Sequence, residues 1–199
     1  RESIREEIGR ISDYDNYVYN SGGFSGVYVS SCPVDHSAEG LFLAEYAEKA
    51  GIDPFDAFCD ILIRNHGLGL GIYFHMSEDD MTEILTHPLC VLGTDGLIGL
   101  PRDNPHPRAF GSTAHAYDLL VGQKKLLTPE AMIHKMSGQT AAFLGLSQKG
   151  HIADGLDADV LLLDLERFCD AATYQSGNAP TQGIEKIFIG GREITLPQA

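Results

Sequence analysis

Apolar residues recur at helical spacing in several stretches of the chain. Ile4, Ile8 and Ile11 lie three or four positions apart among charged residues, which predicts a short amphipathic helix over residues 1–12. Further helices are expected over residues 37–50, 54–65, 77–86, 113–123, 129–136 and 138–144. The residues expected to cap helix N-termini are Ser37, Asp53, Ser77 and Thr128. Several of these segments end at a glycine or before a proline, which marks where each helix stops.

Short apolar runs separate these helices and predict strands. Residues 26–30 and 72–75 each have the length and composition of one strand. The run Leu89–Leu92 lies between Pro88 and Gly93 and is apolar throughout, as in a parallel strand that is buried on both faces. Helices that alternate with such strands favour an α/β fold built from βα units.

The pattern changes after Gly150. Residues 159–164 enclose four consecutive apolar positions, and segments 184–189 and 192–194 flank the pair Gly190-Gly191. A glycine pair supplies the positive φ angles that a two-residue hairpin turn requires. The last fifty residues are therefore expected to form a small β unit attached to the α/β body.

Charge and composition exclude several classes of partner. The chain has 199 residues, with 14 Lys and Arg against 28 Asp and Glu and a net charge of −14. Proteins that bind nucleic acid or anionic membranes need clustered basic residues, so neither partner is expected. No apolar run approaches the ~20 residues that span a bilayer, and residues 1–7 do not resemble a signal peptide. The four cysteines are far apart and form no CxxC pair, which favours the reduced cytoplasm.

Asp95 is the strongest candidate for a catalytic group. It follows the apolar run 89–92 within the sequence Gly93-Thr-Asp-Gly96, and reactive groups of parallel α/β folds gather at the carboxyl ends of strands. A carboxylate there can accept a proton from a metal-bound water and return it to a leaving group. The alternative interpretation is that Asp95-Gly96 is only a turn.

A second candidate lies in residues 96–107, which are rich in Gly, Pro, Asn and Asp and predict a long functional loop. At its end, the two prolines of Pro105-His106-Pro107-Arg108 stiffen a loop that presents an imidazole and a guanidinium. Arginine suits bidentate binding of a carboxylate, although a structural salt bridge is the alternative. The eight histidines form no HxH, HExxH or Cys/His cluster, so their spacing predicts no metal site.

An ordered series of short motifs runs through residues 37–194. Its pieces are Leu43–Ala47, Gly51–Pro54, Met76–Asp80, His87-Pro88, Gly93–Gly96, His106–Arg108, Gly111, Leu127–Ala131, Lys135–Ser137, Ala141–Gly145, Gly150–Gly155, Ala158–Val160, Ala172–Tyr174, Gly183-Ile184 and Gly190. In this order they resemble the C-terminal part of the D-aminoacylases, or N-acyl-D-amino-acid deacylases, of the metal-dependent amidohydrolase superfamily.

The resemblance implies an α/β fold that is the C-terminal portion of an amidohydrolase (β/α)8 TIM barrel, with part of a small β-sandwich. Residues 1–36 would be part of an insertion, 37–148 the last βα units of the barrel, and 149–199 strands of the sandwich. The implied reaction is zinc-dependent hydrolysis of an N-acyl-D-amino acid to a carboxylate and a D-amino acid.

In that reaction Asp95, ending the eighth barrel strand, would be the general base and acid. Arg108 would hold the substrate carboxylate, and His106 and Gly96 would also bind substrate. The family has an aromatic and a basic residue near the substrate where this chain has Ala38 and Leu41, so the substrate side chain stays open.

The zinc ligands of the family lie earlier in its sequence and have no counterpart here. A complete barrel also takes about 250 residues, and the chain begins without Met. We therefore expect a part of a longer deacylase that needs the N-terminal half of the barrel as its partner. Zinc would be bound by the complete enzyme and not by this chain. The isolated chain would be inactive, and the oligomeric state of the protein stays open.

Two alternative functions remain at this point. One is a non-catalytic module of the same fold that binds a small molecule or a partner protein. The other is a cyclic amide hydrolase similar to dihydroorotase or hydantoinase, in which the aspartate has the same role.

Overall fold

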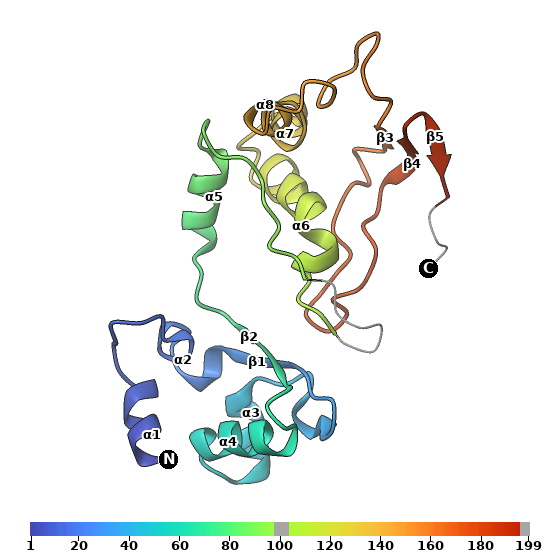
Figure 1. Cartoon of the computed structure of the whole chain (residues 1–199). Coiled ribbons are helices and arrows are strands. Elements are labelled where there is room, and N and C mark those ends of the chain that lie inside the picture. The colour runs from blue at the N-terminus through green and yellow to red at the C-terminus, as the bar shows by residue number, and fades with distance from the viewer. Residues whose placement is uncertain (98–103, 196–199) are drawn as a thin grey trace. The chain divides into compact units, whose positions relative to one another are not determined.

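The computed structural model describes residues 1–97 and 104–195, which belong to two compact units (Figure 1). The N-terminal unit contains residues 1–77 together with 104–106, and the C-terminal unit contains residues 78–97 and 107–195. Residues 98–103, the middle of the predicted functional loop, lie outside the described residues. Within the described ranges no helix has the length and apolarity to cross a membrane.

The N-terminal unit packs helices against a two-stranded antiparallel sheet. Its elements are α1 (Glu2–Ile8), α2 (Tyr17–Asn20), η1 (Phe24–Gly26), β1 (Val27–Ser31), η2 (His36–Ala38), α3 (Leu43–Ala50), α4 (Pro54–Arg64) and β2 (Leu70–Tyr73). In the sheet, Val27 lies opposite Tyr73 and Val29 opposite Gly71. The core includes Val27, Val29, Cys32, Leu43, Ala47, Ala57 and Ile61.

The capping signals explain two boundaries in this unit and miss a third. Asp53 accepts a hydrogen bond from the Phe55 N–H and starts α4, and Gly51 ends α3 with a φ of 67°. Ser37 does not cap α3, because α3 begins only at Leu43 with Phe42 as its N-cap, and Ser37 lies instead in the short helix η2, which Asp35 caps by accepting the Ser37 N–H. The expected strand 72–75 lies instead at 70–73, where pairing with β1 fixes its register.

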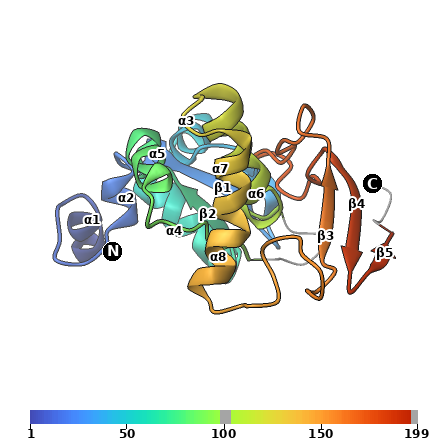
Figure 2. The same ribbon diagram turned by 90° about the horizontal axis from the view of Figure 1, so that it is seen from above.

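The C-terminal unit contains helices and a three-stranded antiparallel sheet in the order β3-β4-β5 (Figure 2). Its elements are α5 (Glu78–Thr86), α6 (Arg108–Tyr117), the π-helix η3 (Asp118–Gln123), α7 (Pro129–Met136), α8 (Gly138–Phe143), β3 (Val160–Leu163), β4 (Ile184–Ile189) and β5 (Arg192–Ile194). Gly190 and Gly191 have φ of 56° and 77°, which confirms the predicted hairpin. The core includes Ala114, Tyr117, Leu120, Met132 and Phe168.

Helix α6 begins earlier than the sequence pattern suggested. Its first residue is Arg108 rather than a residue near 113, because Pro107 already has helical angles of −49° and −30°. The Arg108 carbonyl also accepts a hydrogen bond from the Ser112 hydroxyl at 2.8 Å. The early start places Arg108 in the first turn of a helix rather than in a loop.

The expectation of a buried strand over residues 89–92 is wrong for this structure. No strand is assigned between Leu89 and Leu97, and Leu89 is 87% exposed. A strand needs neighbours that take up its N–H and C=O groups, and no described strand pairs with this segment. The fold is α/β as predicted, but the described residues form two small antiparallel sheets and no closed barrel.

Candidate functional site

Asp95 lies in a short turn at residues 94–96, within the irregular segment 91–97 that follows the turn at residues 87–90. Its φ is +46°, a conformation that Asp tolerates better than most residues because its short side chain can bond the local backbone. The Thr94 hydroxyl accepts the N–H of Gly96 at 3.3 Å. This hydrogen bond closes a turn at residues 94–96, from which the Asp95 carboxylate projects.

Gly96 sets this turn against the start of α6. A methyl group at Gly96 would lie 3.1 Å from the Arg108 carbonyl oxygen and 3.2 Å from the Ala109 Cα, closer than ordinary van der Waals contact. Only glycine accommodates this approach without a shift of backbone. The close contact brings the Asp95 turn directly beside Arg108.

Asp95 and Arg108 form an ion pair across this contact. Arg108 Nη2 lies 3.3 Å from Asp95 Oδ2, and the two side chains are 44% and 83% exposed, respectively. An ion pair this exposed contributes only about 0–1 kcal/mol to stability. The carboxylate is thus accessible to water, and a competing carboxylate can take its place on the guanidinium at little cost.

The structure brings together three of the four predicted site residues. Asp95 and Gly96 lie in a turn of the C-terminal unit that contacts Arg108 at the start of α6. His106 is half-buried in the N-terminal unit, where the Ser30 hydroxyl donates a hydrogen bond to the carbonyl of nearby Asn104.

The described residues do not fit a metal ion by themselves. Among them no three His, Cys, Asp or Glu side chains gather closely enough to hold one. Asp95 offers a single carboxylate and has a guanidinium as its neighbour. A catalytic zinc site needs about three protein ligands.

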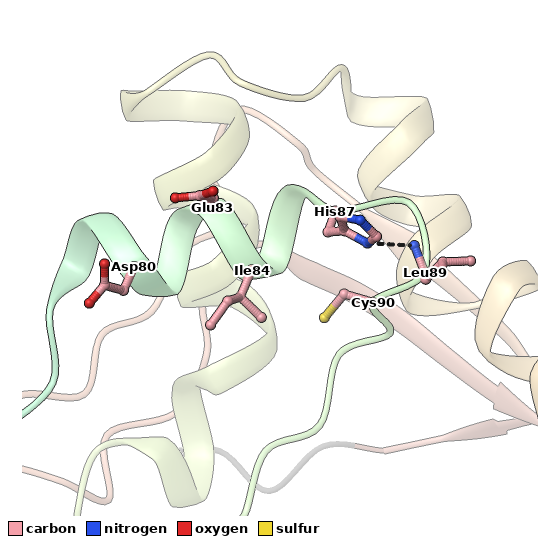
Figure 3. Close-up of a pocket in the computed structure, with 6 residues that line it drawn as sticks. All are labelled: Asp80, Glu83, Ile84, His87, Leu89 and Cys90. Atoms are coloured by element: carbon pink, nitrogen blue, oxygen red, sulfur yellow. Dashed lines mark hydrogen bonds between the residues drawn. The ribbon is translucent and has the colours of Figure 1, made fainter.

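A second feature of the C-terminal unit is an open groove of about 580 Å³ along α5 and the turn after it (Figure 3). Its lining residues are Asp80, Glu83, Ile84, His87, Leu89 and Cys90. The His87 ring accepts the Leu89 N–H at 3.2 Å through Nδ1, so this nitrogen is already used within the turn. The groove is separate from the Asp95 turn.

Lysine side chains bind residues at both ends of helix α5. At its start, the Lys124 ammonium lies 2.8 Å from Glu78 Oε1, and this hydrogen-bonded contact lowers the pKa of Glu78. Beyond its end, the buried Lys135 donates to the carbonyls of His87 at 2.9 Å and Cys90 at 2.6 Å. Sequence analysis placed Lys135 in one of the family motifs but gave it no role, yet a signal exists, because this lysine shares a helix face with the apolar residues Met132 and Met136.

Comparison with known proteins identifies clear relatives, although no family model matches the chain. It is 37% identical over 157 residues to an N-acyl-D-aspartate deacylase of Alcaligenes xylosoxydans, an alignment that covers 79% of the chain and 30% of the relative. It is 36% identical over 161 residues to an N-acyl-D-glutamate deacylase of the same organism, covering 80% of the chain and 31% of the relative.

A solved structure shares the fold. The N-acyl-D-glutamate deacylase of Bordetella bronchiseptica, complexed with zinc and a phosphonate inhibitor that mimics the tetrahedral intermediate, has a TM-score of 0.73 and 29% identity. The match covers 87% of this chain and 35% of that structure, so the chain spans about a third of the length of its relatives. The chain is therefore related in sequence and fold to the D-aminoacylases, as its motifs predicted.

Proposed function

We propose that the chain is part of a zinc-dependent N-acyl-D-amino-acid deacylase and that it supplies the acid–base residue of that enzyme. The relationship to two deacylases at 36–37% identity supports the reaction class. The observation that carries the proposal for the site is the pair Asp95 and Arg108, whose side chains lie 3.3 Å apart at one turn.

Asp95 is the proton carrier in this proposal. Its carboxylate takes a proton from the attacking water as the new C–O bond forms at the amide carbonyl. It then gives the proton to the amide nitrogen as the C–N bond breaks, so that the products are a carboxylic acid and a D-amino acid. An exposed side chain at the tip of a turn suits both steps, because substrate and water can reach it.

Arg108 binds the α-carboxylate of the substrate in the same proposal. In this structure its guanidinium pairs with Asp95. A substrate carboxylate that takes over this guanidinium frees Asp95 for proton transfer, and the exposed pair is weak enough to exchange. Gly96 permits the close approach of the two groups, and His106 is proposed as a further polar contact to the substrate.

Zinc belongs to the complete enzyme rather than to this chain in our proposal. A bound zinc ion supplies Lewis-acid polarisation of the amide carbonyl and a more acidic water. The related Bordetella bronchiseptica enzyme is complexed with zinc. Because the described residues offer no set of three ligands, the ligands are proposed to come from the remainder of the protein.

The barrel is proposed on the same basis. Residues 37–148 would supply its last βα units, 149–199 would belong to a small β-sandwich, and 1–36 would be part of an insertion.

The test is hydrolysis of N-acetyl-D-glutamate and N-acetyl-D-aspartate by the complete protein that contains this segment, followed as release of free amine. We expect hydrolysis of the D-enantiomers and little of the L-enantiomers. Tight binding without hydrolysis would instead support a non-catalytic binding module. Hydrolysis of dihydroorotate or hydantoin, with none of the N-acyl-D-amino acids, would support the cyclic amide alternative.

A further inference from the structure

Lys135 is a buried cation that is paired with neutral groups. Its side chain lies on α7 with 5% of the residue exposed, and its two acceptors in the described part of the chain are the backbone carbonyls of His87 and Cys90. Burying an ammonium is costly, and an apolar side chain of the same size usually fills such a position at a lower cost in stability. The stability of α7 therefore does not explain why a lysine occupies this position, and a functional role does.

Gln139 holds the same turn from the next helix. Its Nε2 donates to the Pro88 carbonyl at 2.6 Å and lies 3.4 Å from that of Cys90. Lys135 on α7 and Gln139 on α8 thus hold three of the four carbonyls in residues 87–90. The turn itself is closed by the Cys90 N–H on the His87 carbonyl at 3.0 Å.

The turn at residues 87–90 begins the segment of backbone that leads to Asp95. From Val91 to Thr94 the backbone has no regular secondary structure, and no described strand pairs with it. The N-terminal end of this segment is held by the turn that Lys135 binds, and its C-terminal end by the contact of Gly96 with α6. The length and direction of this span decide where the Asp95 carboxylate lies relative to Arg108.

We propose that Lys135 is a positioning residue, which acts through the 87–90 turn to place the Asp95 carboxylate for proton transfer, with Gln139 as its auxiliary. This inference rests on the proposed deacylase function. A cation with several N–H donors suits the role because it can hold two carbonyls at once, which no apolar side chain can do.

The experiment compares four variants in the complete deacylase. Lys135→Met removes the donors but keeps the approximate shape, Lys135→Arg keeps a cation with several donors, and Lys49→Met removes one charge from an exposed position of α3. Met132→Ala removes buried side-chain volume from the same helix without removing a hydrogen bond to the turn. The values of kcat, KM and the melting temperature are measured for each.

We expect Lys135→Met to lower kcat per folded molecule about tenfold or more, since a displacement of about 1 Å can cost a hundredfold. KM should stay within about twofold, because the substrate-binding Arg108 is untouched, and Lys135→Arg should restore most of kcat. Met132→Ala should lower the melting temperature at least as much and leave kcat within about twofold, as should Lys49→Met. If Lys135→Met is insoluble, Gln139→Leu should show a smaller loss of kcat of the same kind.

Two results would overturn the inference. One is an unchanged kcat in Lys135→Met or, where that variant is insoluble, in Gln139→Leu. The other is an equal loss of kcat in Met132→Ala.

If the wild-type protein hydrolyses no N-acyl-D-amino acid, the proposed function fails. The hydrogen bonds from Lys135 to the turn are then tested by hydrogen exchange of the Cys90 amide in the 199-residue chain. We expect faster exchange in Lys135→Met than in wild type. Unchanged exchange would show that Lys135 does not hold the turn.

Discussion

Gly96→Ala adds one methyl group at the contact between the Asp95 turn and α6. The new Cβ would lie 3.1 Å from the Arg108 carbonyl oxygen and 3.2 Å from the Ala109 Cα, both of them backbone atoms, so the turn must move by a few tenths of an ångström. Overpacking of this kind costs about 1–3 kcal/mol, offset by about 0.4–1 kcal/mol from the stiffer unfolded chain. The shift moves the Asp95 carboxylate away from Arg108, and we expect kcat/KM to fall about threefold to tenfold.

Gly93 provides a matched control in the same segment. Its added Cβ would have nothing within 4 Å, so Gly93→Ala changes the unfolded chain equally without pressing on α6. The assay is kcat/KM of the complete deacylase on an N-acyl-D-amino acid, with the melting temperature of both variants measured alongside. Equal losses in the two variants, or a Gly96→Ala enzyme within about twofold of wild type, would refute the role of this contact.

The remaining predictions address substrate binding, stability and metal content. Arg108→Lys keeps the charge but loses the planar fork, so binding of N-acyl-D-amino acids should weaken by about 1–3 kcal/mol, and of the corresponding amides by less; equal losses in kcat/KM would show that the arginine only supports its turn. The pKa of Asp35 is lowered to about 2, first by hydrogen bonding from Ser37 and then by Arg64, so its stabilising effect is complete above about pH 4 and is lost as the pH falls toward 2. Asp35→Asn should therefore lower the melting temperature near pH 6 and make little difference near pH 2; a gap that persists in acid would contradict this. Elemental analysis of the purified 199-residue chain should find no stoichiometric zinc, and one tightly bound zinc per chain would contradict the assignment of the ligands to the rest of the enzyme.

Local signals in the sequence were sufficient for most helices and for the hairpin. Asp53 and Thr128 cap helices as expected, and the pair Gly190-Gly191 makes the turn between β4 and β5. Each of these features depends on residues close together in sequence. Ser37 was misassigned because Asp35 caps a separate short helix at this point and α3 begins only at Leu43, a break that a pattern of apolar positions does not reveal.

Long-range contacts account for what could not be predicted. Residues 89–92 have the composition of a buried strand, but strand formation depends on neighbours that the segment itself does not specify. The nearness of Asp95 and Arg108 depends on the contact of Gly96 with α6, which spacing alone does not reveal. The burial of Lys135 was visible only as a lysine on an apolar helix face, and its acceptors lie 45 and 48 positions away.

The most direct measurement is the turnover of Asp95→Asn in the complete deacylase, with its zinc content determined on the same sample. The amide keeps the shape of the side chain but cannot accept a proton from water, so we predict that kcat falls by about 100-fold to 10,000-fold while zinc content stays near that of wild type. Turnover close to wild type would contradict the acid–base role and leave Asp95 as a turn residue alone.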